Sequence, residues 1–224
     1  RFILLTNYQR YVDHFEEYGR LEVAERDEYD RFVAPGNVVA PNARFGDAAP
    51  SGRPPEHLPQ MPAYHLTRPD NRGITMVNIG VGPSNARTIT DHLAVLRPHC
   101  WLMLGHCAGL RRSQQLGDYI LAHGYVREDH VLDQALPAFV PVPPIAEVQV
   151  ALQDAVVNVT GLAGAAVKTR MRTGTVASTD NRNWELRYDE LWERLNQSRA
   201  IAVDMESATI AANGFRFRVP YGTL

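Results

Sequence analysis

The chain has 224 residues, of which 45% are hydrophobic and 21% are charged, and its formal net charge is −2. This composition suits one large α/β domain or two small ones, and the near-neutral charge argues against a general nucleic-acid-binding surface. No apolar run approaches the roughly 18 residues of a membrane span, no secretory signal is visible, and the two cysteines lack metal-binding spacing. We therefore expect a reduced, cytoplasmic protein without a metal or redox cofactor, which contacts neither nucleic acid nor membrane.

The N-terminal stretch predicts a short strand followed by a helix. Residues 2–5 are apolar and suit a buried strand, and apolar side chains recur at helical spacing over 8–18, with Gly19 as the expected end. Arg10 falls in the first turn of this helix, where the helix dipole does not stabilise a cation. A bound anion would explain this position, and so would a solvated surface. Residues 24–63 are rich in proline and glycine, which predicts a long loop or insertion with little regular structure.

A predicted hairpin leads into the first of two Gly-rich loops. Its strands cover residues 64–66 and 74–79, and the turn-forming residues lie at 69–73. The loop at 80–86 opens a helix, with Ser84 as a natural N-cap. A strand, a glycine turn and a helix in this order present backbone N–H groups to an anion. The loop lacks the dinucleotide-binding fingerprint and the lysine of a P-loop, so it fits a sugar or phosphate group better.

The second Gly-rich loop, at residues 105–112, follows a predicted strand at 100–104 and contains His106, Arg111 and Arg112. In a parallel sheet both Gly-rich loops would lie on the same edge, where open α/β folds bind their ligands. The two loops thus predict one site that contains an imidazole and two guanidinium groups.

Strands and helices continue to alternate along the rest of the chain. The predicted strands are 119–125 and 173–180, and the predicted helices are 145–159 and 187–199. Trp184 follows the second of these strands, and it could form a stacking wall for a flat base or anchor the core. This alternation predicts an α/β fold with a central mixed, largely parallel sheet flanked by helices.

The last strand and helix carry a candidate functional carboxylate. Residues 200–203 suit a short buried strand, and residues 206–213 suit a helix that Gly214 ends. Glu206 thus lies at a strand-to-helix junction and can accept two hydrogen bonds, which suits the vicinal hydroxyls of a ribose. Met205 beside it offers an adaptable apolar surface to a sugar ring. Alternatively, Glu206 is only a first-turn residue that the helix dipole favours.

Several of these motifs also occur together in a known family. Three loops match its superfamily, and they lie at residues 80–85, 105–110 and 203–208. A narrower match lies at residues 6–13, 91–98, 180–188 and 215–224. With these motifs the chain resembles the catalytic domain of the AMP nucleosidase family, within the nucleoside phosphorylase/uridine phosphorylase superfamily.

The resemblance implies a single nucleoside phosphorylase-like catalytic domain over residues 1–224, in which 24–63 form the loop or insertion. Because the sequence starts and ends abruptly in predicted strands, we expect a domain truncated at both ends. It implies hydrolysis of the N-glycosidic bond of AMP to adenine and ribose 5-phosphate, as part of purine nucleotide salvage or degradation. Superfamily members usually assemble as dimers stacked into hexamers, so a homo-oligomer is expected as well.

The resemblance also implies roles for individual residues. Glu206 would bind the ribose hydroxyls, Met205 would pack on the sugar, and Ser178, Thr179 and Trp184 would frame the adenine. Hydroxyl contacts that strengthen as positive charge develops on the ribose would favour the transition state, and protonation of purine N7 would improve the leaving group. In the superfamily that general acid is an aspartate just past the final strand of this sequence, beyond its last residue.

The residues that activate the nucleophile and bind the 5′-phosphate are less narrowly defined by the resemblance. Met103 stands where related phosphorylases have a phosphate-binding arginine, which favours water over phosphate as the nucleophile. His106 is a candidate for activating that water, because a neutral imidazole suits this task, and holding the loop is its alternative role. The 5′-phosphate needs cationic or amide partners, and the candidates are Arg10, Ser84, Asn85, Arg111, Arg112 and Arg182.

Two other functions compete with hydrolysis of AMP. One is a purine nucleoside phosphorylase that uses inorganic phosphate, and Met103 argues against it. The other is a catalytically incomplete fragment that binds a nucleotide without turnover. Phosphate dependence of cleavage would identify the first, and tight AMP binding without turnover would identify the second.

Overall fold

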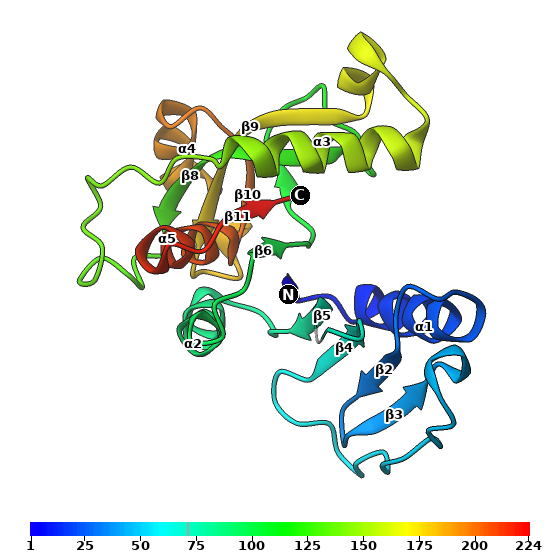
Figure 1. The fold of residues 1–224 in the computed structure, drawn as a ribbon. Coiled ribbons are helices and arrows are strands. Elements are labelled where there is room, and N and C mark those ends of the chain that lie inside the picture. Colours follow the sequence, from blue (N-terminus) through cyan, green and yellow to red (C-terminus); the bar gives the residue numbers. More distant parts are fainter. Residues whose placement is uncertain (71) are drawn as a thin grey trace. The chain divides into compact units, whose positions relative to one another are not determined.

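The computed structural model describes residues 1–70 and 72–224 and shows a mixed α/β protein (Figure 1). The chain forms two compact units. The N-terminal unit comprises Arg1–Gly80 with Pro98–Trp101, and the C-terminal unit comprises Val81–Arg97 with Leu102–Leu224. Each unit is described by itself below. No helix among the described residues is long and apolar enough to cross a membrane.

The N-terminal unit is a sheet packed against one long helix. Its strands β1 and β5 pair in parallel, and the pairs β5–β4, β4–β2 and β2–β3 are antiparallel. The core lies between this sheet and the helix, and Val12, Phe15 and Phe32 belong to it. The elements are β1 (Phe2–Thr6), α1 (Gln9–Glu25), β2 (Arg31–Ala34), β3 (Val38–Pro41), the 3-10 helix η1 (Ala43–Phe45), β4 (Ala63–Thr67), β5 (Gly73–Asn78) and the first half of β6 (Cys100–Met103).

The predicted end of the first helix at Gly19 is wrong. Helix α1 continues through Gly19 to Glu25. A Cβ atom on Gly19 would lie 2.4 Å from Cδ2 of Phe32, so this glycine lets the helix approach the sheet closely. The glycine therefore serves packing rather than termination.

The predicted absence of regular structure in residues 24–63 is wrong for its first half. Strands β2 and β3 form an antiparallel hairpin there, and their turn contains the left-handed residues Gly36 and Asn37. Proline and glycine mark the turn of this hairpin rather than a loop without structure. The hairpin of β4 and β5 is confirmed. Its turn, predicted at 69–73, includes residue 71, which lies outside the described residues.

The C-terminal unit is built on a four-stranded sheet in the order β7-β10-β9-β8. The pairs β8–β9 and β9–β10 are parallel, and the short β7 is antiparallel to β10. Helix α3 packs against β8, α4 packs against β10, and α5 packs against β8 and β9 and beside α2 (Figure 1). The elements are α2 (Pro83–Ala94), the second half of β6, β7 (Ala108–Gly109), β8 (Tyr119–Glu128), α3 (Ala146–Thr160), η2 (Gly164–Thr169), β9 (Met171–Thr179), η3 (Trp184–Arg187), α4 (Tyr188–Gln197), β10 (Ala200–Asp204), α5 (Ser207–Phe217) and β11 (Tyr221–Thr223).

Two local predictions in this unit are wrong, although the mixed α/β class is confirmed. Ser84 is not the N-cap of α2, because the helix starts one residue earlier at Pro83, and Gly82 is the N-cap. Proline suits this position, since its missing N–H is not needed there. Helix α5 passes through Gly214, where a Cβ atom would lie 2.3 Å from Cδ1 of Tyr221.

Candidate active site

The Glu206 carboxylate is tied to the first Gly-rich loop. Its side chain is 1% exposed, and Oε1 accepts a hydrogen bond from the backbone N–H of Gly82 at 2.6 Å. Gly82 has a φ of 112°, a conformation that glycine adopts readily, and it immediately precedes α2. Glu206 occupies the N-cap position of α5, yet its carboxylate binds the neighbouring loop. This placement favours the interpretation of Glu206 as a binding-site residue over the interpretation that it only interacts with the dipole of α5.

The carboxylate of Asp204 joins the ends of β9 and β10 to the start of α5. Its Oδ1 accepts a hydrogen bond from Ser178 Oγ, and its Oδ2 accepts bonds from the backbone N–H of Ser207 at 3.0 Å and from Ser207 Oγ. Ser178 Oγ in turn accepts a bond from the N–H of Ala208 at 2.8 Å. Burial raises the pKa of Asp204 above its usual range, and these hydrogen bonds oppose that shift. Asp204 therefore has a structural role, because it fixes the end of β9 and the start of α5 relative to β10.

Asp129 makes a similar connection from β8, and the sequence reasoning missed it. Its Oδ2 accepts a hydrogen bond from Thr209 Oγ1 at 2.8 Å, and its Oδ1 accepts one from the N–H of Val131 at 3.2 Å. The parallel strands β8, β9 and β10 thus all end in residues that bind the first turn of α5. The sequence signal that could have identified Asp129 is its position directly after β8. Glu206 likewise lies close to the end of a strand, with one residue between it and β10.

Replacing Asp129 by Asn tests its ionisation in the folded protein. Burial raises the pKa of Asp129 in the folded state, so wild-type stability falls as pH rises above the unfolded pKa of about 4. Asn carries no such proton. We expect the unfolding free energy of Asp129→Asn, relative to wild type, to increase from pH 4 to pH 7 in urea titrations. A difference that stays constant or decreases over this range would contradict the assignment.

The second Gly-rich loop brings His106 to the same end of β10. A small cavity of about 20 Å³ lies here, and its lining includes His106, Asp204 and Ser207. Its volume is comparable to that needed for one water molecule. The predicted proximity of this imidazole to the strand exit that carries Glu206 therefore agrees with the structure of the C-terminal unit.

The two arginines of this loop lie elsewhere. Strand β7 runs antiparallel to β10, and the N–H of Leu110 donates to the carbonyl of Ile201 at 2.9 Å, so the chain runs back toward the amino end of β10. Arg111 lines a separate cavity of about 530 Å³ beside Lys168 and Arg172. The length of β10, about 13 Å for its four residue steps, separates this end from Glu206. The structure does not bring Arg111 and its neighbour Arg112 to the Glu206 carboxylate.

The three residues predicted to frame a base, Ser178, Thr179 and Trp184, are all buried. Trp184 is buried, and it packs with Ala177, Leu195 and Val203, which favours core anchoring of the two roles considered. Thr179 Oγ1 accepts a hydrogen bond from the N–H of Asn181, and the Ser178 hydroxyl is taken up by Asp204 and Ala208. The hydroxyls of Ser178 and Thr179 are therefore both engaged in hydrogen bonds within the chain.

The candidates for a phosphate site are divided between the units. Ser84 and Asn85 lie in the first turn of α2, directly after Gly82, and Asn85 Nδ2 donates to the carbonyl of Val81 at 3.3 Å. Arg10 belongs to the N-terminal unit, where its Nε lies 3.4 Å from Nε2 of His14. Arg182 is exposed after β9. Within residues 1–70 and 72–224, no group of three His, Cys, Asp or Glu side chains is arranged to hold a metal ion.

Comparisons with known proteins indicate the family of the chain. A family model described as the phosphorylase superfamily matches residues 35–224. AMP nucleosidases from two strains of Escherichia coli are 58% identical to the chain over 230 residues, which cover 100% of the chain and 46% of each relative. The chain thus spans about half the length of these curated relatives.

Two solved structures resemble the fold. The crystal structure of AMP nucleosidase from Bacteroides thetaiotaomicron has a TM-score of 0.69 at 29% identity, and the match covers 99% of this chain and 78% of that one. A uridine phosphorylase from Vibrio fischeri has a TM-score of 0.66 at 15% identity, with coverage of 99% and 75%. The second likeness concerns the fold alone.

Proposed function

Because the chain belongs to the phosphorylase superfamily, we propose that it forms the catalytic domain of an enzyme that hydrolyses AMP to adenine and ribose 5-phosphate. The observation that carries the proposal is the 58% identity to AMP nucleosidases over the whole chain. The buried Glu206 carboxylate, held by Gly82 at a strand exit, supplies a group that suits the ribose.

Glu206 would act on the sugar. Cleavage of the N-glycosidic bond develops positive charge on the ribose ring, so a carboxylate that binds its hydroxyls is more favourable in the transition state than in the ground state. The bond from Gly82 fixes the orientation of this carboxylate before AMP binds. Met205, half-buried beside it, would contact the apolar face of the sugar.

The adenine would lie near the end of β9, against the backbone of Ser178 and Thr179 and toward Trp184. Departure of adenine is easier once N7 is protonated, which requires a general acid. Asp204 does not suit this task, since both of its oxygens accept hydrogen bonds from Ser178 and Ser207. We assign the acid to no carboxylate of this sequence.

Water would be the nucleophile, and His106 would activate it from the second Gly-rich loop. Met103 supports water over phosphate, because it supplies no cation for inorganic phosphate. The 5′-phosphate would bind at the start of α2, where Ser84 and Asn85 follow Gly82 and where helix N–H groups favour an anion. The position of Arg111 and Arg112 argues against direct contact between their side chains and this phosphate.

The cellular setting follows the same proposal. We infer that the protein is a homo-oligomer, because superfamily members usually assemble from dimers. We also propose that it is cytoplasmic. Light scattering on the purified protein would test the assembly.

Adenine release from AMP tests the activity directly. The full-length protein that contains this chain should release adenine at the same rate with and without inorganic phosphate, because water is the proposed nucleophile. Chromatography of the products would identify adenine together with ribose 5-phosphate. Cleavage that requires phosphate would support a phosphorylase instead, and AMP binding without any turnover would refute the hydrolase.

A further inference from the structure

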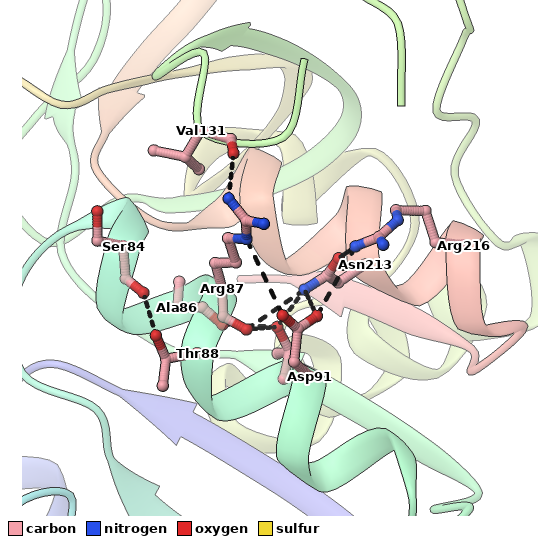
Figure 2. A network of polar contacts seen from close by, with 9 residues as sticks. Ser84, Ala86, Arg87, Thr88, Asp91, Val131, Asn213 and Arg216 are labelled. Carbon is pink, nitrogen blue, oxygen red and sulfur yellow. Dashed lines mark hydrogen bonds and ion pairs between the residues drawn. The ribbon is translucent and has the colours of Figure 1, made fainter. Parts of the chain in front are cut away.

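A polar network that contains the buried Asn213 joins α2 to α5 (Figure 2). Asn213 is fully buried in α5, and its Nδ2 donates to Thr90 Oγ1 at 2.7 Å and to Asp91 Oδ1 at 3.1 Å. The same Nδ2 lies 3.5 Å from the carbonyl oxygen of Arg87. One side chain of α5 thus contacts a full turn of α2.

Two arginines complete this network. Arg216 donates to Asn213 Oδ1, and its Nη1 lies 3.7 Å from Asp91 Oδ1. Arg87 lies 3.9 Å from Asp91 Oδ2 and donates to the carbonyl of Val131 at 2.9 Å. Both ends of the Asn213 amide are therefore bonded, which allows a polar group to be buried here without a large penalty.

The network lies far along both helices from a further polar connection between them. That connection is the hydrogen bond from Gly82 to Glu206, which links the residues that immediately precede α2 and α5. Thr90 and Asn213 lie about 10–12 Å further along their helices, at 1.5 Å per residue. Two connections this far apart fix both the axial register and the angle of one helix against the other.

We propose that Asn213 is a positioning residue for Glu206. By holding the register of α5 against α2, it keeps the carboxylate at the Gly82 N–H, although it lies two turns away from the site. A small apolar residue could fill this space, whereas a fully bonded amide selects one arrangement. The inference rests on the proposed function, because Glu206 is the group that this arrangement would serve.

The first test uses kinetics of AMP cleavage in the full-length protein. Asn213→Ala should lower kcat about tenfold and change KM by less than about threefold, because a small misplacement of a reacting group mainly affects the transition state. If Asn213 acts through Glu206, the same change in a Glu206→Gln background should lower kcat by less than about threefold. An undiminished tenfold loss in that background would overturn the proposal.

Thr90 provides a second variant in case Asn213→Ala folds poorly. Thr90→Val removes the hydroxyl that accepts the Asn213 bond, and Thr90→Ser keeps it, so only the Val variant should lose activity. The matched control is Thr160→Val in α3, whose hydroxyl also donates to a carbonyl four residues earlier. Equal losses for the two Val variants would indicate a general effect on folding.

Hydrogen exchange separates this inference from the proposed function. The Gly82 amide should exchange faster in Asn213→Ala than in wild type, and at the wild-type rate in Thr160→Val. This readout needs no turnover. If wild type fails to cleave AMP, the proposed function fails while the exchange result still decides the positioning role. Unchanged exchange at Gly82 would refute that role.

Discussion

Glu206→Gln should lower kcat for AMP cleavage by at least about 100-fold, while the Kd for AMP changes by less than about tenfold. The substitution keeps the shape of the side chain and one carbonyl oxygen, which can still accept the bond from Gly82. It removes the negative charge that faces the developing positive charge on the ribose. The loss therefore falls on the transition state more than on the bound substrate.

Single-turnover kinetics and equilibrium AMP binding would measure these two effects separately. Glu147→Gln is the matched control, because this exposed glutamate lies in the first turn of α3, outside the proposed site. We expect the control to keep wild-type kcat. If Glu206→Gln also kept it, the assignment of Glu206 to the ribose would be wrong.

The sequence predicts those structural features that follow from local order along the chain. Glu206 was identified because a short apolar strand ends just before it, and this strand and the following helix are confirmed. The first Gly-rich loop was identified in the same way. Their direct contact through Gly82 needed the structure, since 124 residues separate the two positions.

Long-range contacts explain the features that the sequence did not predict or predicted wrongly. Arg111 was placed at the strand exits because its loop follows a strand, but β7 reverses the chain and carries it to the other end of β10. Asp129 was overlooked because its partner, Thr209, lies 80 residues later. The sequence predicts helix ends at Gly19 and Gly214 because the aromatic rings that they contact are distant in sequence.

These contacts also show why α5 is central to the candidate site. Its first turn receives Asp129 from β8, Ser178 from β9 and Asp204 from β10. Glu206 precedes that turn, so the ends of three strands determine where its carboxylate lies. Asn213 contacts α2 from the same helix, one turn beyond Thr209.

Gly214→Ala provides a test of how closely α5 must pack. Alanine favours a helix interior over glycine by about 1 kcal/mol, so local propensity alone predicts stabilisation. The added Cβ, however, would lie 2.3 Å from Cδ1 of Tyr221 and 2.9 Å from the carbonyl oxygen of Val219. Overpacking of this kind costs about 1–3 kcal/mol, and the backbone oxygen cannot rotate away as a flexible side chain can. The difference between the two terms is a net loss of about 1 kcal/mol.

A loss of this size should lower the Tm by about 2–4 °C in a protein of this length. Thermal unfolding of the Gly214→Ala variant would measure it, and Tyr221→Ala would serve as the second member of a double-mutant cycle. Removing the Tyr221 ring should relieve part of the clash, so the two losses should sum to more than the loss of the double variant. An increase in Tm for Gly214→Ala would mean that helix propensity dominates and that α5 has room to move. Independent additive losses would show that the contact with Tyr221 is not the cause.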